Sequence, residues 1–181
     1  PTGGWESLNA NTAKKVSVPG TVEEYMTVSD WPQPTDFSGV SWWFRTLDIP
    51  KDLKDATFIL EFGAVRMRAE VYLDGQLVAY DIVGETPFEA NVTKAIRPGE
   101  KQLLAVRVTN PGGNFHWQDF DVMNWGKYLI PPGRGFGGIL GDVNLKALNP
   151  VYISDIYMQN TPQKTKVNAI ISIRNLTDRK L

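Results

Sequence analysis

The sequence of 181 residues contains no cysteine and a single histidine, His116. The absence of cysteine excludes disulfide bonds, thiolate catalysis and cysteine-based zinc sites, and one histidine excludes a metal site that needs two. A Ser-His-Asp triad would have to include His116, yet no serine stands near it and no Gly-x-Ser-x-Gly turn occurs. We therefore expect no catalytic role for His116.

The sequence also lacks a charge excess and a long apolar run. Nineteen basic and twenty acidic residues give a formal net charge of −1, and the basic residues are scattered, so nucleic acid is not an expected partner. No apolar stretch approaches the ~20 residues that a transmembrane helix needs. We therefore expect no membrane partner either.

The sequence does contain many short segments in which apolar and polar side chains alternate, the period that predicts β-strands. Asp74-Gly75 separates two of them and predicts a hairpin, because both residues tolerate a positive φ. Only residues 22–28 suggest a short helix. We expect an all-β fold with a jelly-roll β-sandwich, with Trp42, Trp43, Phe58 and Phe62 in its core. The predicted strands are residues 16–18, 40–44, 56–62, 70–73, 76–80, 87–92, 102–109 and 141–148.

A domain boundary is predicted at Asn149-Pro150, so that residues 1–149 form the sandwich. Residues 151–158 and 166–174 again read as strands. Because two strands do not make a stable domain, residues 150–181 are expected to be the truncated start of a second one. Their free edges make self-association through these C-terminal strands an expected possibility.

Four segments, taken in order, resemble the N-terminal sugar-binding domain of family-2 glycoside hydrolases, the group of β-galactosidases, β-glucuronidases and β-mannosidases. They are residues 39–45 (Gly-Val-Ser-Trp-Trp-Phe-Arg), residues 61–75 with Tyr-Leu-Asp-Gly at their end, residues 86–110 from Thr-Pro-Phe-Glu to Val-Thr-Asn, and residues 137–145. The resemblance implies a galactose-binding-domain-like jelly roll and then an immunoglobulin-like sandwich, of which residues 150–181 would be the first strands. It also implies a catalytic (β/α)₈ barrel that this chain lacks, and it favours a periplasmic or secreted location.

Two long irregular stretches, residues 29–39 and 110–138, interrupt the strand pattern and are the candidate functional segments. Their aromatic rings can stack on the apolar faces of sugars, while their Asp, Asn and Arg side chains can bind hydroxyls. The same mixture fits an interface with a catalytic barrel, where it would form one wall of an active site, or internal packing under a long loop. The predicted substrate-binding residues are Trp31, Asp36, Asn110, His116, Trp117, Asp119, Asp121, Trp125 and Arg134.

Asp119 and Asp121 are alternate residues and would point the same way on an extended segment. Two carboxylates are too few ligands for a complete calcium or magnesium site, so we expect no cofactor, with a cation near this pair as the weaker alternative.

Catalytic residues are not expected in this chain. Retaining glycoside hydrolysis needs two carboxyl groups about 5–5.5 Å apart, and the adjacent Glu23 and Glu24 fit solvated charges better than such a pair. The sequence therefore predicts a non-catalytic accessory domain that shapes the substrate pocket of a glycosidase. An autonomous carbohydrate-binding module or lectin-like domain is the alternative, and a purely structural interaction domain is a third.

Overall fold

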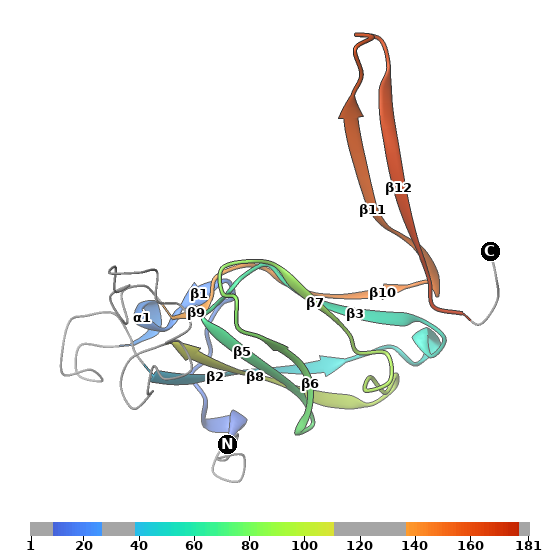
Figure 1. The fold of residues 1–181 in the computed structure, drawn as a ribbon. Helices are drawn as coiled ribbons and strands as arrows, with labels where there is room; N and C mark the ends of the chain where they lie inside the picture. Colours follow the sequence, from blue (N-terminus) through green and yellow to red (C-terminus); the bar gives the residue numbers. More distant parts are fainter. Residues whose placement is uncertain (1–8, 27–38, 111–136, 178–181) are drawn as a thin grey trace, which may run out of the picture.

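A computed structural model describes residues 9–26, 39–110 and 137–177. It shows two antiparallel sheets stacked as layers, with a small third sheet at one end and a separate C-terminal hairpin (Figure 1). The larger sheet has the order β2 (Gly39–Asp48), β8 (Lys101–Asn110), β5 (Arg68–Leu73), β6 (Gln76–Asp81). The other main sheet has the order β10 (Val143–Leu148), β3 (Thr57–Phe62), β7 (Phe88–Asn91). The all-β prediction is confirmed.

The core lies between the two main sheets, and the period of two in the sequence places it there. Phe58, Leu60 and Phe62 of β3 face the other sheet. Leu104, Val106 and Val108 of β8 and the alternate residues Ala69, Val71 and Leu73 of β5 approach from the opposite side. Burying each large apolar side chain stabilises the fold by about 1.5–3 kcal/mol. Phe62 and Phe88 stack across the β3–β7 pair with ring centroids 4.8 Å apart.

Strand β2 corrects one prediction about the core. Trp43 and Leu47 pack against the buried cluster, whereas Trp42 pairs with Arg107 and points to the opposite, outer face of the sheet. Side chains of β2 alternate between two faces as the sequence predicts, but the face that carries Trp42 and Phe44 is the outer one. The core assignment of Trp42 is therefore wrong, while those of Trp43, Phe58 and Phe62 hold.

A third sheet of two-residue strands, β1 (Gly20–Thr21), β9 (Gly138–Ile139) and β4 (Val65–Arg66), covers one end of the sandwich. Strands this short have no periodicity, so the sequence pattern missed β4 and β9. The strand predicted at residues 16–18 is wrong, since pairing starts only at Gly20. Helix α1 (Val22–Tyr25) follows at once, with a capping box between Thr21 and Glu24. Two single-turn 3₁₀ helices, Ala10–Thr12 and Lys51–Leu53, complete the helical elements of the described residues.

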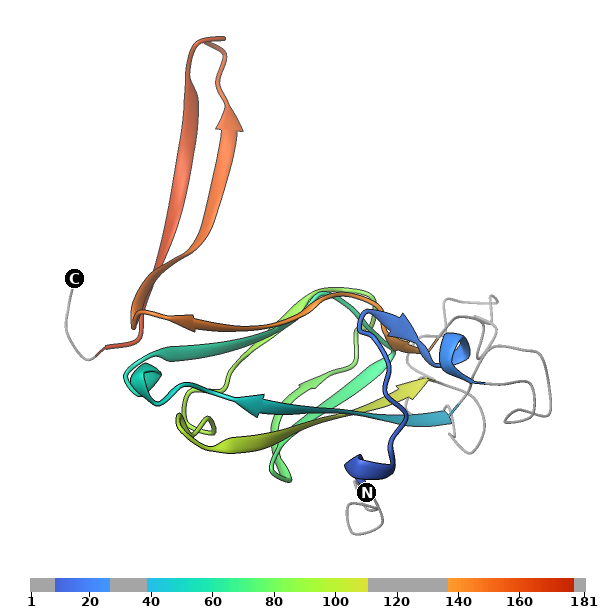
Figure 2. The same ribbon diagram turned by 180° about the vertical axis from the view of Figure 1, so that it is seen from behind.

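The C-terminal strands β11 (Val151–Asn160) and β12 (Val167–Asn175) form a long hairpin that stands away from the sandwich, as both opposite views show (Figures 1 and 2). One ion pair, Arg174 to Glu89 at 2.9 Å, links β12 to β7. Apolar side chains are exposed along both strands: Ile153, Ile156, Tyr157, Met158, Val167, Ile170, Ile171 and Ile173.

The predicted hairpin turn between β5 and β6 is confirmed, and Asp74 fixes it to two other segments. Asp74 and Gly75 have φ values of 46° and 84°. The Asp74 carboxylate accepts hydrogen bonds from the Leu103 backbone N–H at 2.8 Å, from Arg97 at 2.6 Å and from Gln102 at 3.0 Å. Partial burial opposes ionisation of Asp74, but these donors outweigh it and hold the pKa below its ordinary value of 3.8.

Asp74→Asn should lower the free energy of unfolding at pH 7 by about 2 kcal/mol, because the amide nitrogen would face these donors. The folded-state pKa of Asp74 is depressed, so its stabilising effect is complete above pH 3.8 and is lost as the pH falls through the lower folded value. Urea unfolding of both proteins from pH 7 to pH 2.5 should show the difference shrinking.

Asp48→Asn is the matched control, since Asp48 makes only a long, exposed ion pair of 3.8 Å with Lys101. That variant should lose less than about 0.5 kcal/mol. Equal losses in the two variants would contradict the role given to Asp74.

Candidate functional site

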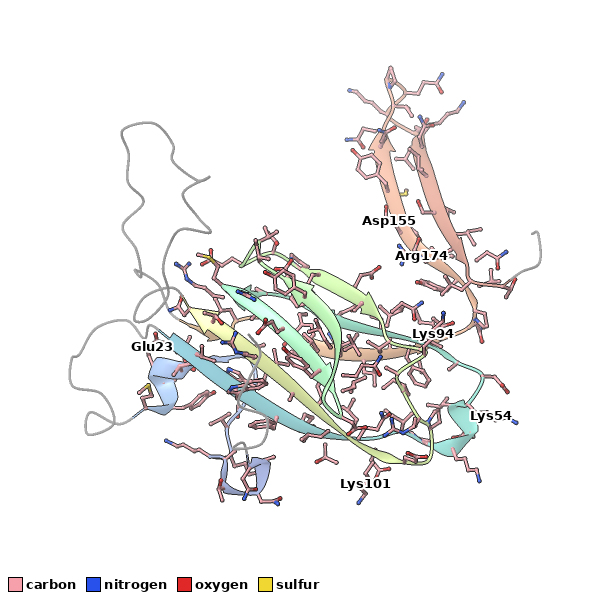
Figure 3. The ribbon with its side chains drawn as sticks, turned by 60° about the horizontal axis from the view of Figure 1, so that its bottom comes forward. Glu23, Lys54, Lys94, Lys101, Asp155 and Arg174 are labelled. Carbon is pink, nitrogen blue, oxygen red and sulfur yellow. The ribbon has the colours of Figure 1, made fainter. Side chains whose placement is uncertain are left out.

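The two segments predicted to carry function are attached at the same end of the sandwich. Gly39, where β2 begins, pairs with Asn110, where β8 ends. Gly137, directly before β9, lies beside Asn110, because an added Cβ on Gly137 would lie 2.9 Å from the Asn110 Cβ. The Gly137 carbonyl also accepts a hydrogen bond of 2.8 Å from the Val22 N–H of α1. In Figure 3, the label of Glu23, on α1, marks this end of the sandwich. The label of Lys101, where β8 begins, lies toward the opposite end of the larger sheet. Tertiary pairing thus places the described ends of both candidate segments side by side.

Asn110 is the predicted site residue that the structure describes, and its side chain is buried, with 1% of the residue exposed. A Cβ on Gly137 would lie 2.9 Å from the Asn110 Cβ, so this glycine allows the two chains to pass closely. The position suits a residue that holds the base of a loop. The other predicted residues, Trp31, Asp36, His116, Trp117, Asp119, Asp121, Trp125 and Arg134, lie outside the described residues and stay predictions.

Several contacts hold α1 and β9 against this end. The Glu23 carboxylate accepts a hydrogen bond from the Gly137 N–H at 3.3 Å, which gives Glu23 a structural partner that the sequence did not predict. Tyr25 packs edge to face on Trp43, with ring centroids 6.1 Å apart. The Tyr25 hydroxyl donates to the Ser17 carbonyl at 2.8 Å. These contacts attach α1 and β9 to the end of the sandwich where β2 begins.

A second surface, which sequence reasoning missed, is the outer face of the larger sheet. Strand register places Trp42, Arg107, Glu70 and Tyr80 in one row across β2, β8, β5 and β6. Glu70 accepts hydrogen bonds from Arg107 at 2.7 Å and from Arg68 at 2.9 Å. The alternation that marks Trp42 and Phe44 was visible in the sequence, but only register shows which residues join them.

The outer face of the smaller sheet is different in character. Glu61, Glu89 and Asn144 lie in one row across its three strands and line a shallow hollow of about 430 Å³ together with Asp142. Lys146 pairs with Glu61 at 2.6 Å and Arg174 pairs with Glu89 at 2.9 Å. Among the described residues, no group of three metal-ligating side chains comes together. None of the helices in the described segments is long and apolar enough to cross a membrane.

The fold defines a β-sandwich module. We call the end marked by Gly39, Asn110 and Gly137, where both candidate segments are attached, the loop-bearing end. Comparison with known proteins gives the family of this module. Residues 4–145 match the model of the sugar-binding domain of glycosyl hydrolases family 2. The chain therefore belongs to this family and carries its sugar-binding domain, which has a jelly-roll-like sandwich fold. The resemblance noted in the sequence is confirmed.

Curated relatives agree with this family. The chain is 27% identical over 157 residues to a β-glucuronidase of Formosa agariphila, covering 82% of this chain and 16% of that protein. It is 27% identical over 155 residues to a β-galactosidase of Thermoanaerobacter pseudethanolicus, covering 81% of this chain and 19% of that protein. The chain thus spans less than a fifth of the length of these two relatives, and the match does not extend to a catalytic domain.

Solved structures show the same fold. A β-glucuronidase from glycoside hydrolase family 2 aligns with a TM-score of 0.69 at 24% identity, covering 93% of this chain and 19% of that one. The β-glucuronidase of Faecalibacterium prausnitzii aligns with a TM-score of 0.68 at 22% identity, covering 93% and 32%.

Gly138→Ala should destabilise the loop-bearing end. Gly138 has a φ of 146°, and an added Cβ would lie 2.6 Å from the Gly20 carbonyl oxygen and 3.4 Å from the Trp43 ring. Both backbone strain and overlap contribute, so we expect a loss of about 3 kcal/mol in the free energy of unfolding, measured by urea titration.

Gly75→Asn is the control, because Gly75 also has a positive φ but nothing lies within 4 Å of an added Cβ. Asparagine tolerates that conformation, so the loss should stay below about 1 kcal/mol. A Gly138→Ala protein as stable as the control would show that β1, β9 and Trp43 are not closely packed.

Proposed function

We propose that this chain is the non-catalytic accessory domain of a family-2 glycoside hydrolase, of the β-galactosidase and β-glucuronidase type. Its loop-bearing end would form one wall of the pocket in which a (β/α)₈ barrel, outside this chain, hydrolyses O-glycosyl bonds. The observation that carries the proposal is the match of residues 4–145 to the family's sugar-binding domain, combined with much longer relatives, of which the chain covers only 19% and 16%.

Residues of the two candidate segments are proposed to contact the sugar at this wall. The geometry supports them indirectly, because Gly39 and Asn110 bring the ends of both segments onto adjacent strands. Trp31 and Asp36 would come from the first segment and Trp117, Asp119 and Trp125 from the second. Asp119 and Asp121 would bind hydroxyls, and no cofactor is proposed for the chain, since two carboxylates do not complete a cation site.

The alternative is an autonomous carbohydrate-binding module, which needs no barrel. The aromatic content of residues 110–138 favours it, because stacking on rings is the main way proteins bind the apolar faces of sugars. In that case the chain alone would bind a galactoside, a glucuronide or a mannoside.

Residues 150–181 are proposed to open an immunoglobulin-like sandwich. The support is their long antiparallel pairing, from Val151 with Asn175 to Asn160 with Val167, and the exposure of apolar side chains that further strands would cover. The same exposure supports self-association of the chain through β11 and β12 when nothing else covers them.

The isolated chain should not hydrolyse nitrophenyl β-galactoside, β-glucuronide or β-mannoside, because the carboxyl pair of the proposed mechanism belongs to the barrel. Absorbance of released nitrophenol over several hours measures this. A rate that copurifies with the chain through two further columns would refute the accessory role.

Truncation after Asn149 should abolish self-association. Sedimentation velocity of residues 1–181 should show a concentration-dependent dimer, and the truncated chain should remain a monomer because the exposed strands are gone. Arg174→Gln is a useful companion, since it removes the ion pair to Glu89 and the hydrogen bond to the Tyr152 hydroxyl but keeps both strands, and it should leave the dimer in place. A dimer that survives truncation would place the contact on the sandwich.

A further inference from the structure

The pairing of β11 with β12 sorts the side chains of the hairpin onto two faces of different character. Ile153 and Ile156 are three residues apart, so strict alternation would place them on opposite faces. A register shift between Ile153 and Asp155 adds one residue to β11 and brings both isoleucines to one side. We call this side the apolar face, and its large side chains are Ile153, Ile156, Met158, Val167, Ile171 and Ile173.

The apolar face is open to solvent. Each of its six large side chains is more than half exposed, from 53% for Ile171 to 58% for Ile173. No strand pair along this face includes a charged residue, whereas the opposite face carries Asp155 and Arg174 beside Tyr157 and Ile170. A two-stranded sheet has no second layer of its own to cover such a face. A contiguous exposed apolar surface of this kind marks a contact with another protein surface.

Contacts at the base of the hairpin turn the opposite face, and not the apolar one, toward the sandwich. Arg174 forms the ion pair of 2.9 Å with Glu89 of β7 and donates a hydrogen bond of 3.4 Å to the Tyr152 hydroxyl. The Leu176 N–H closes the base of the hairpin by donating to the Pro150 carbonyl at 2.9 Å. Because the hairpin also stands clear of the sandwich (Figures 1 and 2), another molecule can reach the apolar face along its length.

A second copy of the chain is the occupant that matches this face. Two identical uncharged faces are self-complementary about a two-fold axis, and sheets that stack in this way lie about 10 Å apart with their strands within about 30° of each other. With six half-exposed side chains from each copy, stacking would remove on the order of 1,000 Å² from water, which reaches the size of a specific interface. Pairing through the strand edges would instead leave both apolar faces in water.

We propose that the chain dimerises through the apolar face, with the hairpins of two copies stacked as a two-layered sandwich of four strands. The inference rests on the self-association proposed above for β11 and β12, and it assigns that contact to one face of the hairpin rather than to its edges. The face that carries Arg174 stays outside the interface and keeps its ion pair with Glu89.

Two adjacent isoleucines of β12 provide a matched test, because they share a strand and an exposure but not a face. Ile171 is 53% exposed on the apolar face, and Ile170 is 51% exposed on the opposite one. Ile171→Asp in the full chain should weaken dimerisation at least tenfold in sedimentation equilibrium, because a carboxylate would be buried among apolar side chains. Ile170→Asp should change the dissociation constant less than twofold. Far-UV circular dichroism verifies that both variants keep their strands.

Cross-linking gives a second readout that buries no charge. The chain has no cysteine of its own, so one introduced thiol reports on one position. Ile171 and its partner Ile156 lie near the middle of the β11–β12 ladder, so a two-fold axis through the apolar face brings the two copies of residue 171 close together. A short bis-maleimide should therefore join Ile171→Cys chains at least tenfold faster than Ile170→Cys chains.

The proposal is overturned if the wild-type chain stays monomeric at its highest soluble concentration, or if a dimer survives truncation after Asn149. It is also overturned if both aspartate variants weaken the dimer equally, as pairing through strand edges predicts, or if both cysteine variants cross-link equally fast. Equal effects of the two variants would leave self-association of the hairpin standing and remove only the assignment of the face. None of these results alters the accessory role, whose own test is the absence of turnover.

Discussion

The pairing of β2 with β8 is the interaction on which the rest of this structure depends. It runs without interruption from Gly39 with Asn110 to Asp48 with Lys101. Because alternate side chains of paired strands point the same way, this one register fixes both surfaces of the sheet. It directs Trp43 and Val106 into the core and sends Trp42 and Arg107 to the opposite face. A shift of the register by one residue would exchange the core side chains with the outer side chains, so one pairing determines both.

The same ladder also decides where the loop-bearing end lies. Its last pair, Gly39 with Asn110, joins the described ends of the two candidate segments, and the close passage of Gly137 over Asn110 ties β9 to that point. The other end is fixed by the Asp74 carboxylate, which joins the β5–β6 turn to β8 and to Arg97. The loop-bearing end is thus attached to a sheet whose opposite end is fixed by Asp74.

The outer face of the larger sheet differs from an ordinary solvated sheet face. Its middle is buried, with Glu70 and Tyr72 each 3% exposed, whereas Leu77 and Tyr80 on the edge strand β6 are each 50% exposed. Glu70 stabilises this face, because without its buried carboxylate the neighbouring Arg68 and Arg107 would repel each other.

The sequence by itself determined the strands of four or more residues, the Asp74-Gly75 turn, the order of the segments and the family. These features are local, because alternation, turn chemistry and motif spacing are properties of neighbouring residues. It could not determine that Trp42 lies outside while Trp43 lies inside, since alternation shows two faces without telling which is buried. It also could not find the two-residue strands β4 and β9, or the row of Trp42, Arg107, Glu70 and Tyr80. Only tertiary structure decided these, because partners such as Glu70 and Arg107 are 37 residues apart in the chain and meet only when the strand register is set.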